Sequence, residues 1–197
     1  MTTEDRKIAV FLDRDGTVIV DKLYLADPEG VELLPDAGSA IFRLNRRGIK
    51  AILVTNQSGV ARGCFTRERV DEIHRRLLAL LAGEGARLDA IYYCPHLPPE
   101  ELPAGVTPCD CRKPDVGLVQ RARDDHGLDL HRSFCLGDRL TDVEMALRMG
   151  GTGILVKTGY GENALEAHDG VERDFHVREN IADAVDLILS LVATDRT

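Results

Sequence analysis

Short apolar runs that alternate with amphipathic stretches determine what this chain can fold into. Runs of this kind, bounded by turn residues, are typical of strands that are buried on both faces of a sheet. The stretches between them repeat apolar residues at intervals of three and four, as helices that cover a sheet do. This alternation predicts an α/β fold with a doubly wound, mostly parallel sheet and helices on both faces. The predicted strands cover residues 8–12, 49–54, 90–93, 134–136 and 154–156.

Start and stop signals place helices between and after these strands. Thr66 is a typical N-cap residue, and Pro114 is typical of a first helical turn. Thr141 and Glu144 form a capping-box pattern. Glycine, which favours the left-handed conformation that ends helices, follows or closes most of these stretches. The predicted helices cover residues 36–47, 66–83, 114–127, 141–149 and 180–192.

Length and composition limit the class of protein. A chain of 197 residues can bury one good core, so we predict a single domain over residues 1–197. The net charge of −8 argues against a nucleic acid or an anionic membrane as partner, since both need clustered Lys and Arg. No signal peptide or membrane span is visible, so a cytoplasmic location is expected. As a separate expectation, the protein is a monomer. The five cysteines are odd in number, and the expected compartment is reducing, so metal binding is more plausible than a disulfide framework.

An acidic pair follows the first predicted strand directly. Asp13 and Asp15 are two residues apart, so in extended backbone their side chains point the same way and repel each other. A divalent cation would relieve that repulsion at the carboxyl end of a strand, where open α/β sheets bind ligands. Asp and Gly are also common turn formers, so the motif alone is compatible with a plain turn. An EF-hand is excluded, because its Gly at position 6 and Glu at position 12 are missing.

Hydroxyl and amide side chains follow the second predicted strand. Thr55, Asn56, Gln57 and Ser58 stand where the carboxyl end of that strand should lie. Groups of this kind can donate several hydrogen bonds to the oxygens of a phosphate. They also form ordinary loops, so this segment by itself leaves both interpretations open.

Two further segments add charge at the same edge of the predicted sheet. Arg112 and Lys113 precede a predicted helix, although an Arg-Lys pair is often only a surface charge pair. Asp138 follows the fourth predicted strand, and Asp142 can be read as a helix cap. The predicted topology brings five side chains to one crevice in an arrangement that suits phosphoryl transfer. These five are Asp13, Asp15, Thr55, Lys113 and Asp138.

A loop at residues 94–111 carries a second set of metal ligands. Three thiolates and one imidazole make a closed tetrahedron of the kind that structural zinc occupies. Free buried thiols are the alternative, because the C-x-H and C-x-C spacings are tighter than in most zinc fingers. Zinc in this loop would fix the directions of Arg112 and Lys113, which follow it. The four ligands are Cys94, His96, Cys109 and Cys111, whereas Cys64 and Cys135 are expected to be core or loop residues.

Taken together, these segments resemble the motifs of the haloacid dehalogenase superfamily of phosphohydrolases. The resemblance implies that Asp13 is a nucleophile that forms an aspartyl-phosphate and that Asp15 is the general acid and base. It implies a Mg²⁺ ion held by Asp13, the main-chain carbonyl of Asp15, and Asp138. Thr55 and Lys113 would stabilise the phosphoryl group. A metal and a lysine are needed because a phosphate dianion repels a carboxylate nucleophile.

The loop narrows this resemblance to one branch of the superfamily. C-P-H followed by C-D-C-R-K-P is similar to the branch of the D-glycero-D-manno-heptose 1,7-bisphosphate 7-phosphatases and the histidinol-phosphate phosphatases. The long spacer from His96 to Cys109 is more similar to the heptose type, which implies removal of the 7-phosphate of a small phosphorylated sugar. No room remains for a cap domain, so the site should be open. The expected substrate contacts are Asp21, Tyr24, Asn56, Gln57, Ser58, Arg112 and Arg139.

Three other functions stay open at this point. Histidinol-phosphate hydrolysis would use the same residues. A phosphoryl-receiving signalling domain has a similar sheet, although two acidic residues on one strand favour hydrolysis. A zinc-held interaction module would make the acidic pair incidental. The remaining histidines are expected at the surface or at helix ends, namely His74, His126, His131, His168 and His176.

Overall fold

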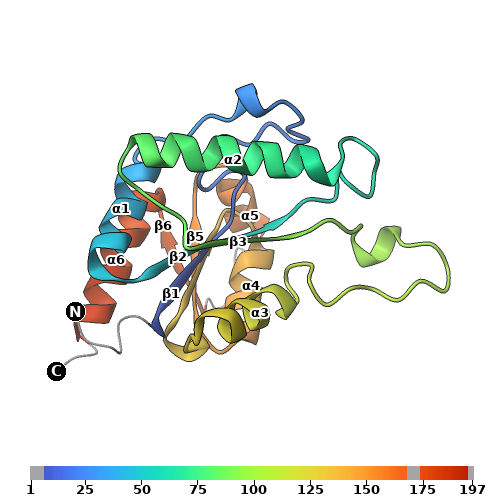
Figure 1. Ribbon diagram of the computed structural model, residues 1–197. Coiled ribbons are helices and arrows are strands. Elements are labelled where there is room, and N and C mark those ends of the chain that lie inside the picture. Colours follow the sequence, from blue (N-terminus) through green and yellow to red (C-terminus); the bar gives the residue numbers. More distant parts are fainter. Residues whose placement is uncertain (1–6, 168–173, 195–197) are drawn as a thin grey trace.

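The chain forms one six-stranded sheet in the order β3-β2-β1-β4-β5-β6, with every paired strand parallel. A computed structural model describes residues 7–167 and 174–194 (Figure 1). The predicted doubly wound α/β fold is confirmed. The strands are β1 (Ala9–Leu12), β2 (Lys50–Asn56), β3 (Ala90–Cys94), β4 (Phe134–Gly137), β5 (Thr152–Val156) and β6 (His176–Arg178).

Helices cover both faces of the sheet (Figure 1). Side chains alternate along β1, so that Val10 and Leu12 pack with α1, α2 and α6, while Phe11 packs with α3 and α4. Complete burial on both faces explains why the central strands are continuous apolar runs. The helices are α1 (Ala37–Arg47), α2 (Arg67–Gly83), α3 (Gly117–His126), α4 (Leu140–Arg148), α5 (Gly161–Ala167) and α6 (Ile181–Thr194), and the short 3-10 turns are Pro28–Gly30, Pro99–Glu101 and Leu130–Arg132.

The strand order reverses between β1 and β4. To one side of β1 the chain builds β2 and β3, and to the other side of β4 it builds β5 and β6. Loops leave such a switch point in opposite directions and open a crevice at the carboxyl ends of the strands, where α/β proteins bind ligands. The fold therefore places Asp13 and Asp138, which directly follow β1 and β4, at this crevice.

Two predicted helix starts are wrong. Pro114 does not open α3, which begins at Gly117, because residues 112–115 form a turn in which the Asp115 N–H donates to the Arg112 carbonyl at 2.8 Å. Thr141 does not cap α4 either. That helix begins one residue earlier, and the carboxylate of Asp142 accepts from the main-chain N–H of the N-cap residue Arg139.

The prediction for His74 is also wrong. His74 is 6% exposed, because it lies on the apolar face of α2, four residues after Val70 and one after Ile73. His131 and His176 are exposed and His126 is half-buried, as expected, while His168 lies outside the described residues.

Two elements near the end of the chain were not predicted. The edge strand β6 is partly exposed and carries His176 and Arg178, so it lacks an apolar run. The short helix α5 packs on β5. Among the described residues, no helix combines the length and the apolar character that crossing a bilayer would require.

Candidate functional site

Lys113 is the buried centre of the candidate site. Its ammonium group donates to Asp13 Oδ1 at 2.6 Å, to Asp142 Oδ1 at 2.6 Å and to the Val54 carbonyl at 2.9 Å. Burial by itself would lower the pKa of Lys113, but the two carboxylates outweigh it and raise that pKa. The lysine is therefore a permanent cation beside Asp13. The sequence suggested no more than a helix cap for Asp142, but its carboxylate also orients the ammonium group of Lys113.

Three carboxylates gather at the switch point. Oxygens of Asp13, Asp138 and Asp142 all lie within 4.8 Å of one another. Burial, reinforced by the charge of Asp13, raises the pKa of Asp138 to about 7. Burial also raises the pKa of Asp142 to about 6, although Lys113 opposes the shift. Negative charge is thus crowded in a site from which water is largely excluded, and a cation would relieve it.

One oxygen of this cluster lacks a partner within the described chain. Asp138 Oδ2 accepts from the Tyr160 N–H at 2.8 Å, but Asp138 Oδ1 is buried with no hydrogen bond. A buried carboxylate oxygen without a donor is costly. Hard oxygen ligands of this kind are those that Mg²⁺ takes, so the residues fit the expected ion.

Glycine at position 16 lets the two loops of the site approach each other. Gly16 has a φ of +78°, and a Cβ atom there would lie 2.2 Å from Asp138 Oδ2. A Cβ on Gly137 would lie 2.2 Å from the carboxylate of Asp142. The glycine of D-x-D-G-T is therefore required for contact between segments that are distant in the sequence, and the glycine of G-D lets the nearby Asp142 pack against the end of β4.

Buried polar side chains hold the carboxylate of Asp15 in place. Its carboxylate accepts from the Arg14 guanidinium at 2.9–3.2 Å and from Gln57 Nε2 at 2.9 Å. Gln57 Nε2 also donates to the buried hydroxyl of Thr55 at 2.9 Å. Burial raises the pKa of Asp15, while Arg14 lowers it. Sequence analysis missed Arg14, although a cation between two acidic residues was a visible signal.

An open cleft with a volume of about 660 Å³ lies in front of these groups. Of the expected substrate contacts, Gln57 does not line it, because that side chain is 5% exposed and faces Asp15. Asn56 lines the cleft and also exchanges two hydrogen bonds with the main chain of Lys113, at 3.1 and 3.2 Å. The other lining residues that the sequence predicted are Asp21, Tyr24, Ser58, Arg112 and Arg139.

Arginines stand around the rim of the cleft. The guanidinium of Arg139 stacks on the ring of Tyr160 at 4.2 Å and lies 3.6 Å from Asp21. Arg62, which sequence analysis did not single out, pairs with Glu101 at 2.6 Å. That pair joins the loop after β2 to the loop at 94–111, so both loops shape the same opening.

The loop at 94–111 holds its four predicted metal ligands together. Contacts of 3.2–3.6 Å connect Cys94 Sγ with Cys111 Sγ, Cys109 Sγ and His96 Nδ1. His96 Nδ1 lies 3.3 Å from Cys111 Sγ. Bonds of about 2.3 Å from zinc to sulfur would put the corners of a tetrahedron about 3.8 Å apart, so three sulfurs and one nitrogen fit structural zinc.

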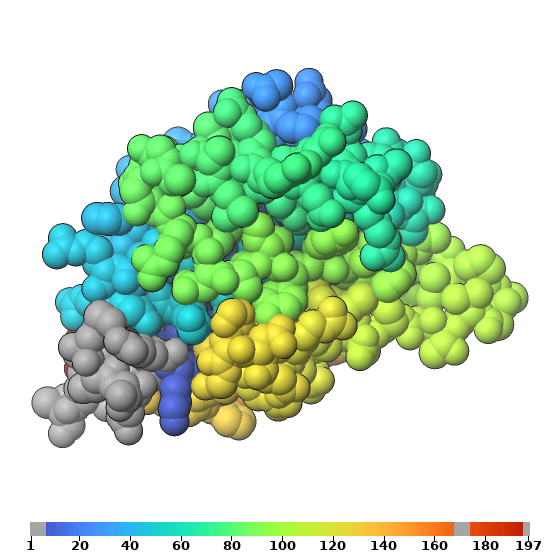
Figure 2. Space-filling view, in the orientation of Figure 1, coloured from blue at the N-terminus to red at the C-terminus, as the bar shows by residue number. Residues whose placement is uncertain are grey.

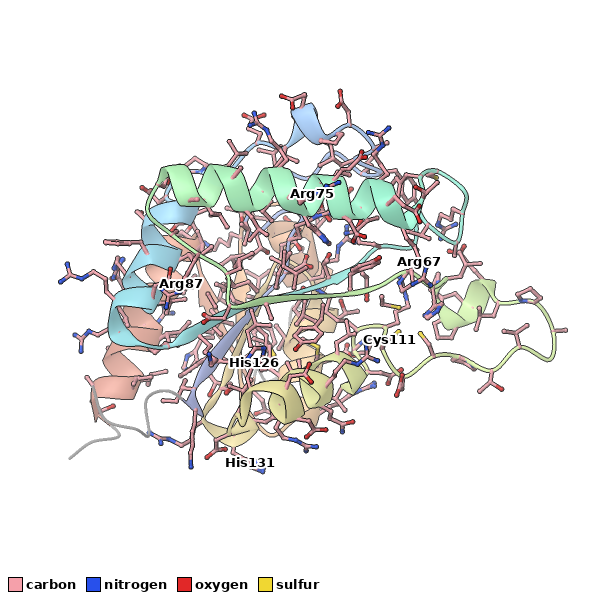
Figure 3. The ribbon with its side chains drawn as sticks, viewed as in Figure 1. Arg67, Arg75, Arg87, Cys111, His126 and His131 are labelled. Atoms are coloured by element: carbon pink, nitrogen blue, oxygen red, sulfur yellow. The ribbon has the colours of Figure 1, made fainter. Side chains whose placement is uncertain are left out.

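The position of this loop connects it to the cleft. It projects from the body as a separate lobe (Figure 2), and Cys111 lies at its base, where the chain turns back toward α3 (Figure 3). The guanidinium of Arg112 donates to the His96 carbonyl at 3.2 Å. A metal in the loop would therefore also hold Arg112 at the cleft.

Comparison with known proteins agrees with this geometry. A HAD-hydrolase-like family model matches residues 110–184. A D-glycero-D-manno-heptose-1,7-bisphosphate 7-phosphatase from Thermosynechococcus vestitus is 39% identical over 193 residues, covering 94% of this chain and 97% of that protein. The D-glycero-beta-D-manno-heptose-1,7-bisphosphate 7-phosphatase of Escherichia coli strain K12 is 40% identical over 152 residues, covering 77% of this chain and 80% of that protein.

Solved structures give the same result. The D,D-heptose 1,7-bisphosphate phosphatase from B. bronchiseptica, crystallised with magnesium and phosphate, has a TM-score of 0.82 and 34% identity, covering 93% of this chain and 99% of that one. The corresponding enzyme from Burkholderia thailandensis has a TM-score of 0.70 and 27% identity, covering 93% of this chain and 99% of that one. The chain is therefore a phosphatase of the haloacid dehalogenase type and belongs to the family of the D-glycero-D-manno-heptose-1,7-bisphosphate 7-phosphatases.

Proposed function

We propose that this chain is a Mg²⁺-dependent phosphatase that removes the 7-phosphate of a D-glycero-D-manno-heptose 1,7-bisphosphate. The observation that carries the proposal is the contact between Asp13 and Lys113, beside the unpartnered oxygen of Asp138. The chain that makes this contact aligns over 94% of its length with a phosphatase of that name. This contact supports Asp13 as the nucleophile, with its charge balanced by a lysine.

The two carboxylates of the first motif divide the chemistry. An oxygen of Asp13 attacks phosphorus, a new O–P bond forms, and the bond to the sugar oxygen breaks while Asp15 gives that oxygen its proton. Asp15 then takes a proton from water, which attacks phosphorus and releases phosphate and the carboxylate of Asp13. Mg²⁺ would be held by Asp13, the carbonyl of Asp15 and Asp138, and would neutralise charge on the phosphoryl oxygens. Lys113 and Thr55 would stabilise the same negative charge on the phosphoryl oxygens.

The charge of the cleft favours a second phosphate on the substrate. Arg112 and Arg139 both line the cleft, and Arg112 is held by a neutral carbonyl, so its positive charge remains available. Arginine binds phosphate well because its planar donors match two phosphate oxygens. A heptose bisphosphate offers such a group, whereas histidinol phosphate offers a cation.

Phosphate release tests the proposal. Purified protein should release phosphate from the heptose 1,7-bisphosphate in Mg²⁺, with kcat/KM higher than for histidinol phosphate, and EDTA should stop the reaction. Asp13→Asn keeps the shape of the side chain and should abolish turnover while the thermal unfolding curve remains cooperative.

Three results would contradict the proposal. Turnover by Asp13→Asn would refute the nucleophile. Higher kcat/KM for histidinol phosphate would reassign the substrate. One equivalent of stable acyl-phosphate without turnover would indicate a phosphoryl-receiving domain.

A further inference from the structure

Arg14 is a buried cation that the proposed reaction does not use. It is 1% exposed and stands in the chain between the proposed nucleophile and the proposed acid and base. Burying a guanidinium is costly unless its donors are used. Its Nε and one terminal nitrogen donate to Asp15, and that same terminal nitrogen donates to Gln57 Oε1 at 2.9 Å. Arg14 is therefore directed at the carboxylate of Asp15 rather than at the cleft.

The other terminal nitrogen of Arg14 faces a histidine from a different part of the chain. It lies 3.4 Å from Nε2 of His74, which stands on α2, 60 residues away. A guanidinium can only donate, so Nε2 of His74 must be the acceptor and must carry no proton. Burial, and then the charge of Arg14, lower the pKa of His74 to about 3. His74 is thus a neutral imidazole that presents a lone pair to Arg14.

His74 is itself held in place by packing. Its ring meets the ring of Tyr93 on β3 edge to face, with the centroids 5.6 Å apart. Its neighbours on the same face of α2, Ile73 and Leu77, belong to the core. A rigid helix therefore fixes the acceptor that orients Arg14.

Gln57 completes the arrangement from the loop after β2. Its Oε1 accepts from Arg14 while its Nε2 donates to Asp15 Oδ2 at 2.9 Å, so it joins the arginine to the carboxylate a second time. Both oxygens of Asp15 consequently have donors. Turning this carboxylate away would leave buried donors of Arg14 and Gln57 without their acceptor, which is costly.

We infer that Arg14, Gln57 and His74 are positioning residues that hold the carboxylate of Asp15 where it exchanges protons with the leaving sugar oxygen and with water. This inference rests on the proposed function, in which Asp15 is the acid and base. It goes beyond that function because it assigns a positioning role to a histidine of α2 and to a buried arginine that do not line the cleft. We name these three residues the Asp15 cradle.

The position of Asp15 matters for proton transfer, so the effect of His74 and Arg14 on it should depend on the leaving group. A sugar alkoxide must receive a proton as it leaves, whereas 4-nitrophenolate leaves without one. Loss of the cradle should therefore slow cleavage of a sugar phosphate more than cleavage of 4-nitrophenyl phosphate. A purely structural role would slow both alike.

The test uses two variants of His74. His74→Leu removes the acceptor but keeps an apolar side chain, and His74→Gln restores a neutral oxygen acceptor. Single turnovers with enzyme in excess measure the first cleavage step directly, without the later hydrolysis of the phosphoenzyme. We expect His74→Leu to slow this step about 10- to 100-fold for the heptose bisphosphate and less than about threefold for 4-nitrophenyl phosphate, since misplacing a catalytic group by about 1 Å costs about that much. His74→Gln should recover most of the loss.

A control on the same helix separates positioning from stability. Ile73→Val removes one buried methylene next to His74, so it should lower the melting temperature and leave the ratio of the two rates unchanged. If His74→Leu does not fold, His74→Phe keeps a planar ring without an acceptor and should give the same preference for the aryl substrate. Equal slowing of both substrates, no slowing of either, or no recovery in His74→Gln would overturn the inference.

The proposed function fails in a different way. If the wild-type chain cleaves neither substrate in Mg²⁺, or if Asp13→Asn still turns over, the acid and base role of Asp15 is refuted. The positioning role of the cradle is then refuted as well. If the wild type is active and depends on Asp13 while the leaving group makes no difference in His74→Leu, only the cradle is refuted.

Discussion

Nζ of Lys113 lies 2.6 Å from Oδ1 of Asp13, although 100 residues separate the two in the chain. The same nitrogen is 2.6 Å from Asp142, so one buried cation joins the loop after β1, the start of α4 and the segment that follows the loop at 94–111. This contact both balances the charge of Asp13 and holds three segments together.

Lys113→Met should therefore affect both stability and activity. It leaves two buried carboxylates without their cation, and the free energy of unfolding at pH 7 should fall by about 3–5 kcal/mol. Phosphatase activity should disappear. Urea unfolding followed by circular dichroism measures the first effect. Adding Asp142→Asn removes one of the stranded charges and should recover part of the stability but none of the activity.

Lys157→Met is the matched control, because that lysine pairs with Glu179 at the surface. Exposed pairs contribute little, so its unfolding curve should match the wild type. Equal stability of Lys113→Met and the wild type would show that the buried contact does not exist in solution.

Gly16→Ala should inactivate the enzyme through Asp138. The new Cβ would stand 2.2 Å from Asp138 Oδ2 at a φ of +78°, so the carboxylate must move away from the Mg²⁺ position. We expect a loss of about 100-fold or more in kcat/KM. Gly127→Ala has the same kind of backbone strain, with a φ of +63°, but no atom lies within 4 Å of its Cβ. That control should lose about 1–2 kcal/mol of stability and keep its activity. Similar kinetics for the two variants would count against the close approach.

Cys109→Ser should release zinc and weaken activity from a distance. The loop would no longer hold Arg112 against His96, so we expect kcat/KM to fall about 10- to 100-fold, which is typical for loss of a supporting contact around a metal site. Metal content by mass spectrometry and phosphate release give the two readouts. Cys64→Ser changes an exposed thiol outside the cluster and should retain both zinc and activity. Zinc loss with unchanged kinetics would show that the loop does not orient Arg112.

His74→Gln should change how stability depends on pH. The pKa of His74 is about 3 in the folded chain against 6.5 as the ordinary value, so between these limits the unfolded chain binds more protons. The contribution of His74 is complete above pH 6.5 and is lost as the pH falls toward 3. Within that window, each unit by which the pH falls lowers the free energy of unfolding by about 1.4 kcal/mol through protonation of His74 in the unfolded chain. His74→Gln removes this pH dependence.

The measurement is urea unfolding at intervals from pH 7 to pH 4. The difference in stability between wild type and His74→Gln should shift in favour of the variant as the pH falls. Val70→Ala, which shortens a buried apolar side chain of the same helix, should lose the same amount at every pH. Parallel curves for His74→Gln would show that His74 binds a proton as easily folded as unfolded.

Much of the fold was readable because the central strands are buried on both faces. In β1, β2 and β5 the buried central positions form an apolar run, so the strand is visible without any knowledge of its neighbours. The edge strand β6 pairs on one side only and keeps polar residues, so it was missed. The start of α3 was misjudged because the preference of proline for a first helical turn is local, whereas residues 112–115 form a turn and Lys113 within it contacts Asp13 and Asp142 from distant segments.

The sequence by itself determined the parallel sheet, the acidic residues at its edge and the group of Cys and His in the loop, because each depends on residue type and on spacing within one segment. Only the tertiary structure decided which of these groups meet. The contacts of Arg14 with His74 and of Lys113 with Asp142 join residues 60 and 29 positions apart. No local pattern encodes such contacts, since they arise when packing of helices on the sheet brings polar groups into a space from which water is excluded and where they must satisfy one another.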